Sequence, residues 1–323
     1  MGYKNGIAVA GTVIVDRIYE ISAYPQSGQL TQISNIEKAV GGCVPNVALD
    51  LKRICPQLPI RVFGRVGNDS DGDYVQEILK NAGLDTSGLR TDKNVLTSFT
   101  DVMSVTGGQR TFFTYSGARA EFGAADIEFG AYLPEILHLG YFLLLQKVDD
   151  GDGLEILKSA KAKGIRTSID LVSENSDRYA LVKPCLPYTD YLIVNELEAG
   201  MLTGIEPNNA NLQSIAEALK TMGVREKVII HKPDCAVCLS EEGFTSLPSY
   251  ALPEGYIKGT TGAGDAFCAG ALYGIYEGWT DRQILEFASA AAVMALGAAD
   301  ATSGLTDVQT IQTFCRKFQR QEM

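Results

Sequence analysis

Residues 259–270 read Gly-Thr-Thr-Gly-Ala-Gly-Asp-Ala-Phe-Cys-Ala-Gly, a run of small residues that leads directly into a helix-compatible apolar pattern. The glycines fall on the first turn of the predicted helix, where backbone N–H groups have no partner within the helix. With no side chain at Gly262 or Gly264, an anion can approach these N–H groups, and the helix dipole favours its negative charge. The stretch therefore predicts a phosphate pocket.

Asp265 is unexpected in such a pocket, because a carboxylate repels a bound phosphate. The conflict disappears if the carboxylate takes a proton from a hydroxyl group that attacks the phosphorus. The structural alternative is a glycine-rich helix start in which Asp265 only complements the helix dipole. The residues of this stretch alone leave both interpretations open.

Composition and charge exclude several classes of protein. The chain has 323 residues, of which 46% are hydrophobic and 21% charged, as in an ordinary globular protein. Its net charge of −11 argues against nucleic acid or an anionic membrane as the main partner, because both need a basic surface. The seven scattered cysteines suit a reducing cytoplasm better than a disulfide framework, and no segment reaches membrane-spanning length.

Apolar periodicity predicts an α/β fold. From residue 136 onward, strands are expected at 136–145, 165–171, 191–194 and 227–231, and helices at 153–163 and 211–222. This alternation is typical of a parallel sheet with helices on both faces. Near the N-terminus, residues 7–15 read as a strand that ends at Asp16. Sheets of this kind place their ligands at the carboxyl ends of the strands, although an Asp after a strand is also a common turn residue.

The stretch 260–270 resembles the C-terminal signature of the ribokinase-like (PfkB) family of carbohydrate kinases. Two further stretches match other signatures of this family in the right order, namely Gly41-Gly42 through Asn46 and Asn195-Glu196-Leu197-Glu198. The resemblance covers nearly the whole chain. It implies one kinase domain over residues 1–323, built as a three-layer α/β sandwich around a mostly parallel sheet, with a small β-sheet lid.

The resemblance also implies roles for individual residues. Asp265 is expected to be the general base, beside N–H groups contributed by Gly262, Ala263 and Gly264. Asp16, Gly42 and Asn46 are expected to bind the sugar. The residues alone also allow Asn46 to cap a helix, a role that is compatible with sugar binding.

Asn195, Glu198 and Thr261 are expected to bind ATP, with Glu198 holding Mg²⁺ mainly through water. Asn195 and Glu198 are three residues apart and follow a predicted strand, so they fall on one face of a helical turn. The same spacing suits a capping pair at a helix start, which is the structural alternative.

Residues 17–39 and 95–117 are expected to form the lid. Strand-like runs at 95–105 and 110–115 flank Thr106-Gly107-Gly108-Gln109, a hairpin signal. The aromatic residues on these strands need apolar cover from a closed substrate cleft or from a second subunit. In the family such a sheet covers the sugar and is often a dimer surface, so the resemblance implies a homodimer. Arg110 and Arg119, as isolated arginines, are expected to be solvated.

We therefore predict an enzyme that uses ATP to phosphorylate a primary hydroxyl of a sugar. A nucleoside, pseudouridine or vitamin-precursor kinase of the same fold is the alternative, because the residues named above recognise a hydroxyl and a phosphate and little else. A non-catalytic metabolite-binding relative is a further alternative, and the retention of Asp265 counts against it. The family also has a substrate-contacting acid, expected just after Leu145, where this chain has Gln146-Lys147-Val148.

A departure from the family pattern predicts weak dependence on potassium. Many ribokinase-like enzymes carry an Asp two residues before the threonine of the Gly-Ala-Gly-Asp motif, where it helps to hold K⁺, and this chain has Gly259 there. Glycine offers only a carbonyl oxygen, and the neighbouring Lys258 disfavours a cation. We expect less than tenfold activation when the rate in K⁺ is compared with that in a bulky organic cation at equal ionic strength. Activation of tenfold or more, about 1.4 kcal/mol on the barrier, would show that carbonyl oxygens suffice.

Overall fold

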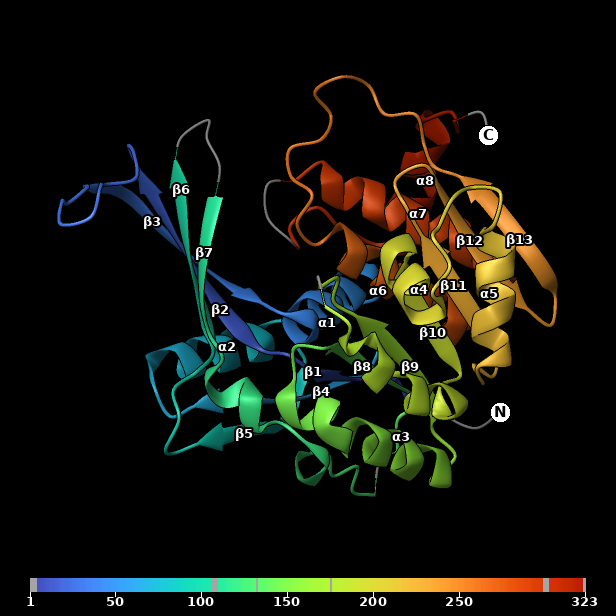
Figure 1. The fold of residues 1–323 in the computed structure, drawn as a ribbon, viewed down its shortest axis with the longest axis horizontal. Helices are drawn as coiled ribbons and strands as arrows, with labels where there is room; N and C mark the ends of the chain where they lie inside the picture. Colours follow the sequence, from blue (N-terminus) through green and yellow to red (C-terminus); the bar gives the residue numbers. More distant parts are fainter. Residues whose placement is uncertain (1–4, 106–109, 132, 175, 299–301, 322–323) are drawn as a thin grey trace.

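The computed structural model describes residues 5–105, 110–131, 133–174, 176–298 and 302–321 (Figure 1). Its main sheet has nine strands in the order β13-β12-β11-β10-β9-β8-β1-β4-β5. The strands from β5 to β11 in this order are all parallel to their neighbours, and β12 and β13 form an antiparallel edge. The strands are β1 (Ile7–Gly11), β4 (Ile60–Gly67), β5 (Asp85–Asp92), β8 (Ile136–Phe142), β9 (Arg166–Leu171), β10 (Tyr191–Asn195), β11 (Lys227–His231), β12 (Cys235–Ser240) and β13 (Gly243–Pro248).

Helices cover both faces of this sheet and give three layers. One hydrophobic core lies between the sheet and α1, α2, α6, α7 and α8, and a second lies between the sheet and α3, α4 and α5. The helices are α1 (Cys43–Ile54), α2 (Ser70–Asn81), α3 (Gly153–Ala162), α4 (Glu196–Thr203), α5 (Leu212–Thr221), α6 (Ala263–Glu277), α7 (Asp281–Leu296) and α8 (Val308–Phe314). The predicted α/β fold with a mostly parallel central sheet is confirmed.

The central strands are apolar on both sides because both of their faces are covered. All five residues of β1 are buried, and all but one residue of β8 are buried. Continuous apolar runs of this kind are typical of parallel sheets packed between two helical layers. Among the described residues, no helix combines the length and the apolar character needed to cross a bilayer.

Two boundary predictions were wrong. The strand predicted at 7–15 is two strands, because the chain leaves the central sheet at Gly11 (φ 138°) and continues in another sheet as β2 (Ile14–Ile21). Asp16 therefore lies within a strand instead of following one. The strand predicted at 136–145 ends at Phe142, since Leu143 has a positive φ angle that extended backbone does not permit. Tyr141 also has a positive φ angle, and the pairing of β8 with β9 is irregular between Leu139 and Phe142.

The second sheet has four strands in the order β3-β2-β6-β7 and stands apart from the nine-stranded sheet (Figure 1). Its other strands are β3 (Ile33–Gly41), β6 (Phe99–Val105) and β7 (Arg110–Tyr115). We call these four strands the lid sheet. The hairpin turn predicted at 106–109 lies outside the described residues.

Ion pairs fix the base of the lid sheet to the main body. Asp71, on the first turn of α2, binds Lys38 of β3 at 2.6 Å and Arg17 of β2 at 2.5 Å. Farther out the sheet exposes large apolar side chains, including Ile36, Phe112 and Phe113. The expectation of solvated arginines holds for Arg110 and is wrong for Arg119. The Arg119 side chain is buried, and its Nε has no partner among the described residues.

Candidate active site

The first turn of α6 presents free N–H groups. Gly262 caps the helix with a left-handed backbone (φ 81°) that glycine adopts without strain. The hydrogen-bond ladder of the helix begins with the N–H of Ala266, which donates to the carbonyl of Gly262 at 2.8 Å. The N–H groups of Gly264 and Asp265 precede that bond, so the helix supplies them with no acceptor. The geometry therefore agrees with the anion pocket predicted from the sequence.

Asp265 is held beside these groups by two donors from distant parts of the chain. Asn46 Nδ2 donates to Asp265 Oδ2 at 2.9 Å, across 219 positions of sequence. The Tyr141 hydroxyl donates to both carboxylate oxygens, at 3.0 and 2.9 Å. The carboxylate is 6% exposed, and burial raises its pKa to about 7, with a further increase from Asp170. A carboxyl group with a pKa in this range can exchange a proton near neutral pH.

Tyr141 was missed by the sequence reasoning. Its backbone is left-handed (φ 61°), which is uncommon for a residue with a bulky side chain. The Tyr141 N–H donates to Asp170 Oδ1 at 2.5 Å and stabilises this conformation. Backbone strain of this kind persists where the surroundings enforce it and gathers at functional sites. No sequence signal marks the residue, since it reads as part of an apolar strand.

The three predicted sugar-binding residues lie around the end of the lid sheet. Gly42 caps α1 with φ 90°, and a Cβ there would lie 2.6 Å from the carbonyl oxygen of Thr12, so only glycine fits. Asp16 is half-buried against the backbone of Gly41, and burial raises its pKa to about 6. Burial is the only cause of the Asp16 shift, to which no hydrogen bond or charged partner contributes, and the buried Oδ1 of Asn46 has no partner among the described residues. These atoms are acceptors available to a ligand rich in hydroxyl groups.

A cavity of about 990 Å³ adjoins the other side of the α6 start. Its lining includes Ala263 and Gly264 but none of the three predicted sugar-binding residues. Apolar side chains of α6 and α7 form one wall, and Asn195 and His231 lie at the ends of neighbouring strands. Thr261 is exposed and does not line the cavity, whereas its neighbour Thr260 does.

Asn195 and Glu198 form a capping box at the start of α4. Asn195 Oδ1 accepts from the Glu198 N–H at 2.9 Å, and Glu198 Oε2 accepts from the Asn195 N–H at 3.0 Å. Glu198 Oε1 also accepts from the Ser173 hydroxyl at 2.9 Å. Glu198 is 4% exposed, and burial raises its pKa to about 7. The capping role is present in the structure, and the predicted role of Glu198 at a metal ion stays a prediction.

His231 is a further cavity residue that the sequence did not single out. Its ring stacks on Phe267 of α6 with a centroid separation of 4.7 Å. Burial lowers the pKa of His231 to about 4, so the imidazole is neutral at physiological pH. It therefore acts as a flat, uncharged wall of the cavity.

Comparisons with protein families, known proteins and solved structures all find carbohydrate kinases. The family model of pfkB family carbohydrate kinases matches residues 4–307. A ribokinase of Arabidopsis thaliana is 25% identical over 309 residues, which cover 94% of this chain and 79% of that protein. A 5-dehydro-2-deoxygluconokinase of Clostridium perfringens is 24% identical over 299 residues, covering 89% and 87%. The solved structure of Arabidopsis thaliana ribokinase with ribose and ATP superposes with a TM-score of 0.80 at 21% identity, covering 96% of this chain and 98% of that chain.

We predict that Asp265→Asn stabilises the fold at high pH. The folded-state pKa of Asp265 is raised from 3.8 to about 7, so between these values the folded state binds more protons than the unfolded state. Wild-type stability is therefore lost as pH rises through this window, at up to about 1.4 kcal/mol per pH unit. The asparagine variant has no such loss. Its gain in the free energy of unfolding is expected to be near zero below pH 4 and on the order of 2 kcal/mol or more at pH 8.

Urea denaturation of both proteins between pH 4 and pH 8 measures this difference. Asp73→Asn, which changes an exposed acid on the first turn of α2, is the matched control and should show no comparable trend. A gain for Asp265→Asn that does not change with pH would contradict the raised pKa.

Proposed function

Because the chain belongs to the pfkB family of carbohydrate kinases and is a phosphotransferase with an alcohol group as acceptor, we propose that it transfers the γ-phosphoryl group of ATP to a primary hydroxyl of a sugar, with Asp265 as the general base. The observation that carries this proposal is the position of Asp265. Its buried carboxylate adjoins the free N–H groups of α6 and has a pKa raised to about 7.

Asp265 takes the proton of the acceptor hydroxyl as that oxygen attacks phosphorus. Asn46 and Tyr141 fix the carboxylate, and because each of its oxygens can accept more than one hydrogen bond, room is left for the substrate hydroxyl. The N–H groups at Gly262, Ala263 and Gly264 are proposed to stabilise the negative charge of the transferred group, although the Ala263 N–H also donates to the carbonyl of Thr260 at 3.4 Å. Positioning and electrostatic stabilisation supply most of the catalysis in such a reaction, and no covalent enzyme intermediate is required.

The 990 Å³ cavity is the proposed ATP site. It reaches from the first turn of α6 to the apolar wall between α6 and α7. The cavity can therefore hold the phosphates of ATP at one end and its adenine ring at the other. The solved Arabidopsis thaliana ribokinase, which has the same fold, carries ATP. Thr261 is proposed to contact the phosphates from the exposed turn that precedes α6.

Mg²⁺ is the proposed metal, and it supplies charge neutralisation at the phosphates when bound. Asn195 lines the cavity, and the carboxylate of Glu198 lies directly behind it. Since both Glu198 oxygens already accept hydrogen bonds within the protein, Glu198 fits a role that acts through water better than direct coordination.

Asp16, Gly42 and Asn46 are proposed to hold the sugar. The acceptors at Asp16 and Asn46 match the hydroxyl donors of a polyol, and a hydrogen bond to a charged acceptor is worth about 1.5–3 kcal/mol. The ribose of a nucleoside offers the same hydroxyls, so a nucleoside kinase remains the alternative acceptor class. The free state of every described cysteine supports a reducing compartment such as the cytoplasm.

A panel of sugars and nucleosides, assayed for ADP release with Mg-ATP, tests the function. We expect a sugar to be the best acceptor and the product to be phosphorylated at its primary hydroxyl. Asp265→Asn should lower kcat by roughly 10²–10⁴-fold and leave ATP affinity nearly unchanged, because the amide keeps the shape but cannot take the proton. Asp73→Asn should behave as wild type. Near-normal turnover of the Asp265→Asn variant would show that Asp265 is not the general base. Sugar binding by the wild type without release of ADP would indicate a non-catalytic relative.

We also propose a homodimer that forms through the lid sheet. Strand register places Ile18, Val102 and Phe112 opposite one another, on the same face as Asp16. Phe112 is 62% exposed although its ring is large and apolar. A second subunit on this face would cover Phe112 and close the region around Asp16.

Phe112→Lys tests the dimer, and Phe113→Lys is the matched control. Phe113 is the next residue of β7, is 57% exposed, and points to the opposite face. In light scattering we expect a wild-type dimer, a monomer or at least a tenfold weaker dimer for Phe112→Lys, and an unchanged dimer for Phe113→Lys. A monomeric wild type, or equal loss in both variants, would reject this face as the interface.

A further inference from the structure

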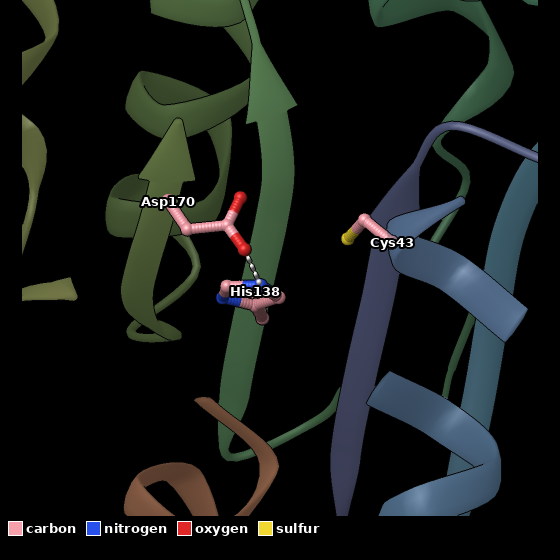
Figure 2. A group of neighbouring side chains, drawn as sticks. All are labelled: Cys43, His138 and Asp170. Atoms are coloured by element: carbon pink, nitrogen blue, oxygen red, sulfur yellow. Dashed lines mark ion pairs between the residues drawn. The ribbon is translucent and has the colours of Figure 1, made fainter. Parts of the chain in front are cut away.

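Four side chains with metal-binding atoms converge in the layer between the central sheet and the helices α1 and α6. They are Cys43 at the start of α1, His138 on β8, Asp170 on β9 and Cys268 on α6. Their exposed fractions are 0, 0, 8 and 2%, respectively. Figure 2 shows that the sulfur of Cys43 and the carboxylate of Asp170 point toward the imidazole from different elements. None of the reactions proposed above uses Cys43, His138 or Cys268.

Two distances within the cluster match those between the ligands of a tetrahedral ion. His138 Nε2 lies 3.4 Å from Asp170 Oδ2 and 3.6 Å from Cys268 Sγ. The ligand atoms of Cys43, His138 and Asp170 lie within 4.8 Å of one another. At usual zinc bond lengths, tetrahedral geometry separates a nitrogen ligand from an oxygen ligand by about 3.4 Å and from a sulfur ligand by about 3.5 Å. Cys268 Sγ does not lie within 4.8 Å of both Cys43 Sγ and the Asp170 carboxylate, so the four-ligand set forms only when a cysteine side chain moves toward the other ligands.

The remaining polar atoms of the cluster hold the ligands in orientation. His138 Nδ1 bonds the Ser168 hydroxyl at 3.1 Å, which leaves Nε2 to face the cluster. Asp170 Oδ1 accepts from the Tyr141 N–H, which leaves Oδ2 directed at His138. Metal-binding histidines and carboxylates usually have such partners, which fix the tautomer and the ring orientation.

Gly140 provides the space for the cluster. It lies two residues after His138 on β8, and a Cβ at this position would overlap the sulfur of Cys43 and lie 3.0 Å from Asp170 Oδ1. Any other residue would therefore separate Cys43 from the two ligands on the sheet.

Within the protein, His138 Nε2 reaches the other metal-binding atoms of the cluster only through long contacts. The separation of 3.4 Å between His138 and Asp170 is long for a hydrogen bond. The Cys268 thiol and His138 Nε2 form a long hydrogen bond of 3.6 Å, and the same Nε2 atom has only a long contact with the Asp170 carboxylate. A cation between these four residues would replace the long contacts with direct metal–ligand bonds.

We propose that Cys43, His138, Asp170 and Cys268 bind one thiophilic divalent metal ion of the zinc type. Two sulfur ligands, one imidazole and one carboxylate favour zinc over magnesium, which prefers oxygen ligands in octahedral geometry. The cysteines bind as thiolates, and their protons leave to solvent. The ion ties the first turn of α1 and the second turn of α6 to β8 and β9. Cys43 directly follows Gly42, and Cys268 lies about one helical turn after Asp265, so the site is a structural clamp beneath the proposed active site.

Cobalt binding to the full chain tests the proposal without reference to kinase activity. After dialysis against a chelator, the protein is titrated with Co²⁺ and then with Zn²⁺ in magnesium-free buffer. We expect one equivalent of Co²⁺ with thiolate-to-cobalt charge-transfer bands and the strong d–d absorption of tetrahedral cobalt, and displacement by Zn²⁺. Zn²⁺ at a hundredfold excess over Kd should raise Tm by about 5 °C or more. Absence of a stoichiometric ion, or a cobalt spectrum without thiolate bands, would overturn the proposal.

Two double variants locate the site. Cys43→Ser with Cys268→Ser should weaken Zn²⁺ binding at least hundredfold. Cys235→Ser with Cys238→Ser changes two other buried cysteines, both on β12, and should bind Zn²⁺ as the wild type does. Equal loss in both variants would overturn the assignment. Since the first double variant can fail to fold, X-ray absorption at the zinc edge of the wild-type protein gives an independent measurement, in which a first shell without sulfur contradicts the proposal.

Discussion

The carboxylate of Asp265 is buried at the positive end of a helix, and much of the surrounding structure offsets the unfavourable free energy of its desolvation. An isolated buried charge is highly unfavourable unless hydrogen bonds or opposite charges compensate it. Here Asn46 and Tyr141 provide donors, while Asp170 in the metal-free protein opposes ionisation. The result is a carboxylate that is neither fully stabilised as an anion nor permanently protonated, and this balance is what a base near neutral pH requires.

Several features of the fold could be predicted because they depend on local pattern. The alternation of strands and helices after residue 136 and the small-residue start of α6 are visible in the sequence, and both are present in the structure. The link between Asn46 and Asp265 could be expected only through the family resemblance, since no local rule joins residues 219 positions apart.

Other parts of the site depend on tertiary pairing and could not be predicted. Tyr141 lies in an apolar run and bonds Asp265 only because its backbone turns left-handed at the end of β8. The sequence predicted that Asp16 follows a strand, because nothing in residues 7–15 indicates that the chain changes sheets after Gly11. The spacing of Asn195 and Glu198 is compatible both with a helix cap and with a metal ligand, so the sequence could not decide between the two roles. The structure shows the cap.

The change of sheets after Gly11 has a consequence for recognition. Asp16 belongs to the lid sheet, whereas Asn46 and Asp265 belong to helices packed on the central sheet, and only short connections at residues 12–13 and 42 join the two bodies on this side. Any displacement of one body against the other changes the separation of Asp16 from Asp265. A ligand that contacts both sides binds only the aligned arrangement, so its apparent affinity is its intrinsic affinity multiplied by the fraction of molecules that are aligned. The ion pair between Lys38 and Asp71 joins the two bodies, so it would act on this fraction through their alignment.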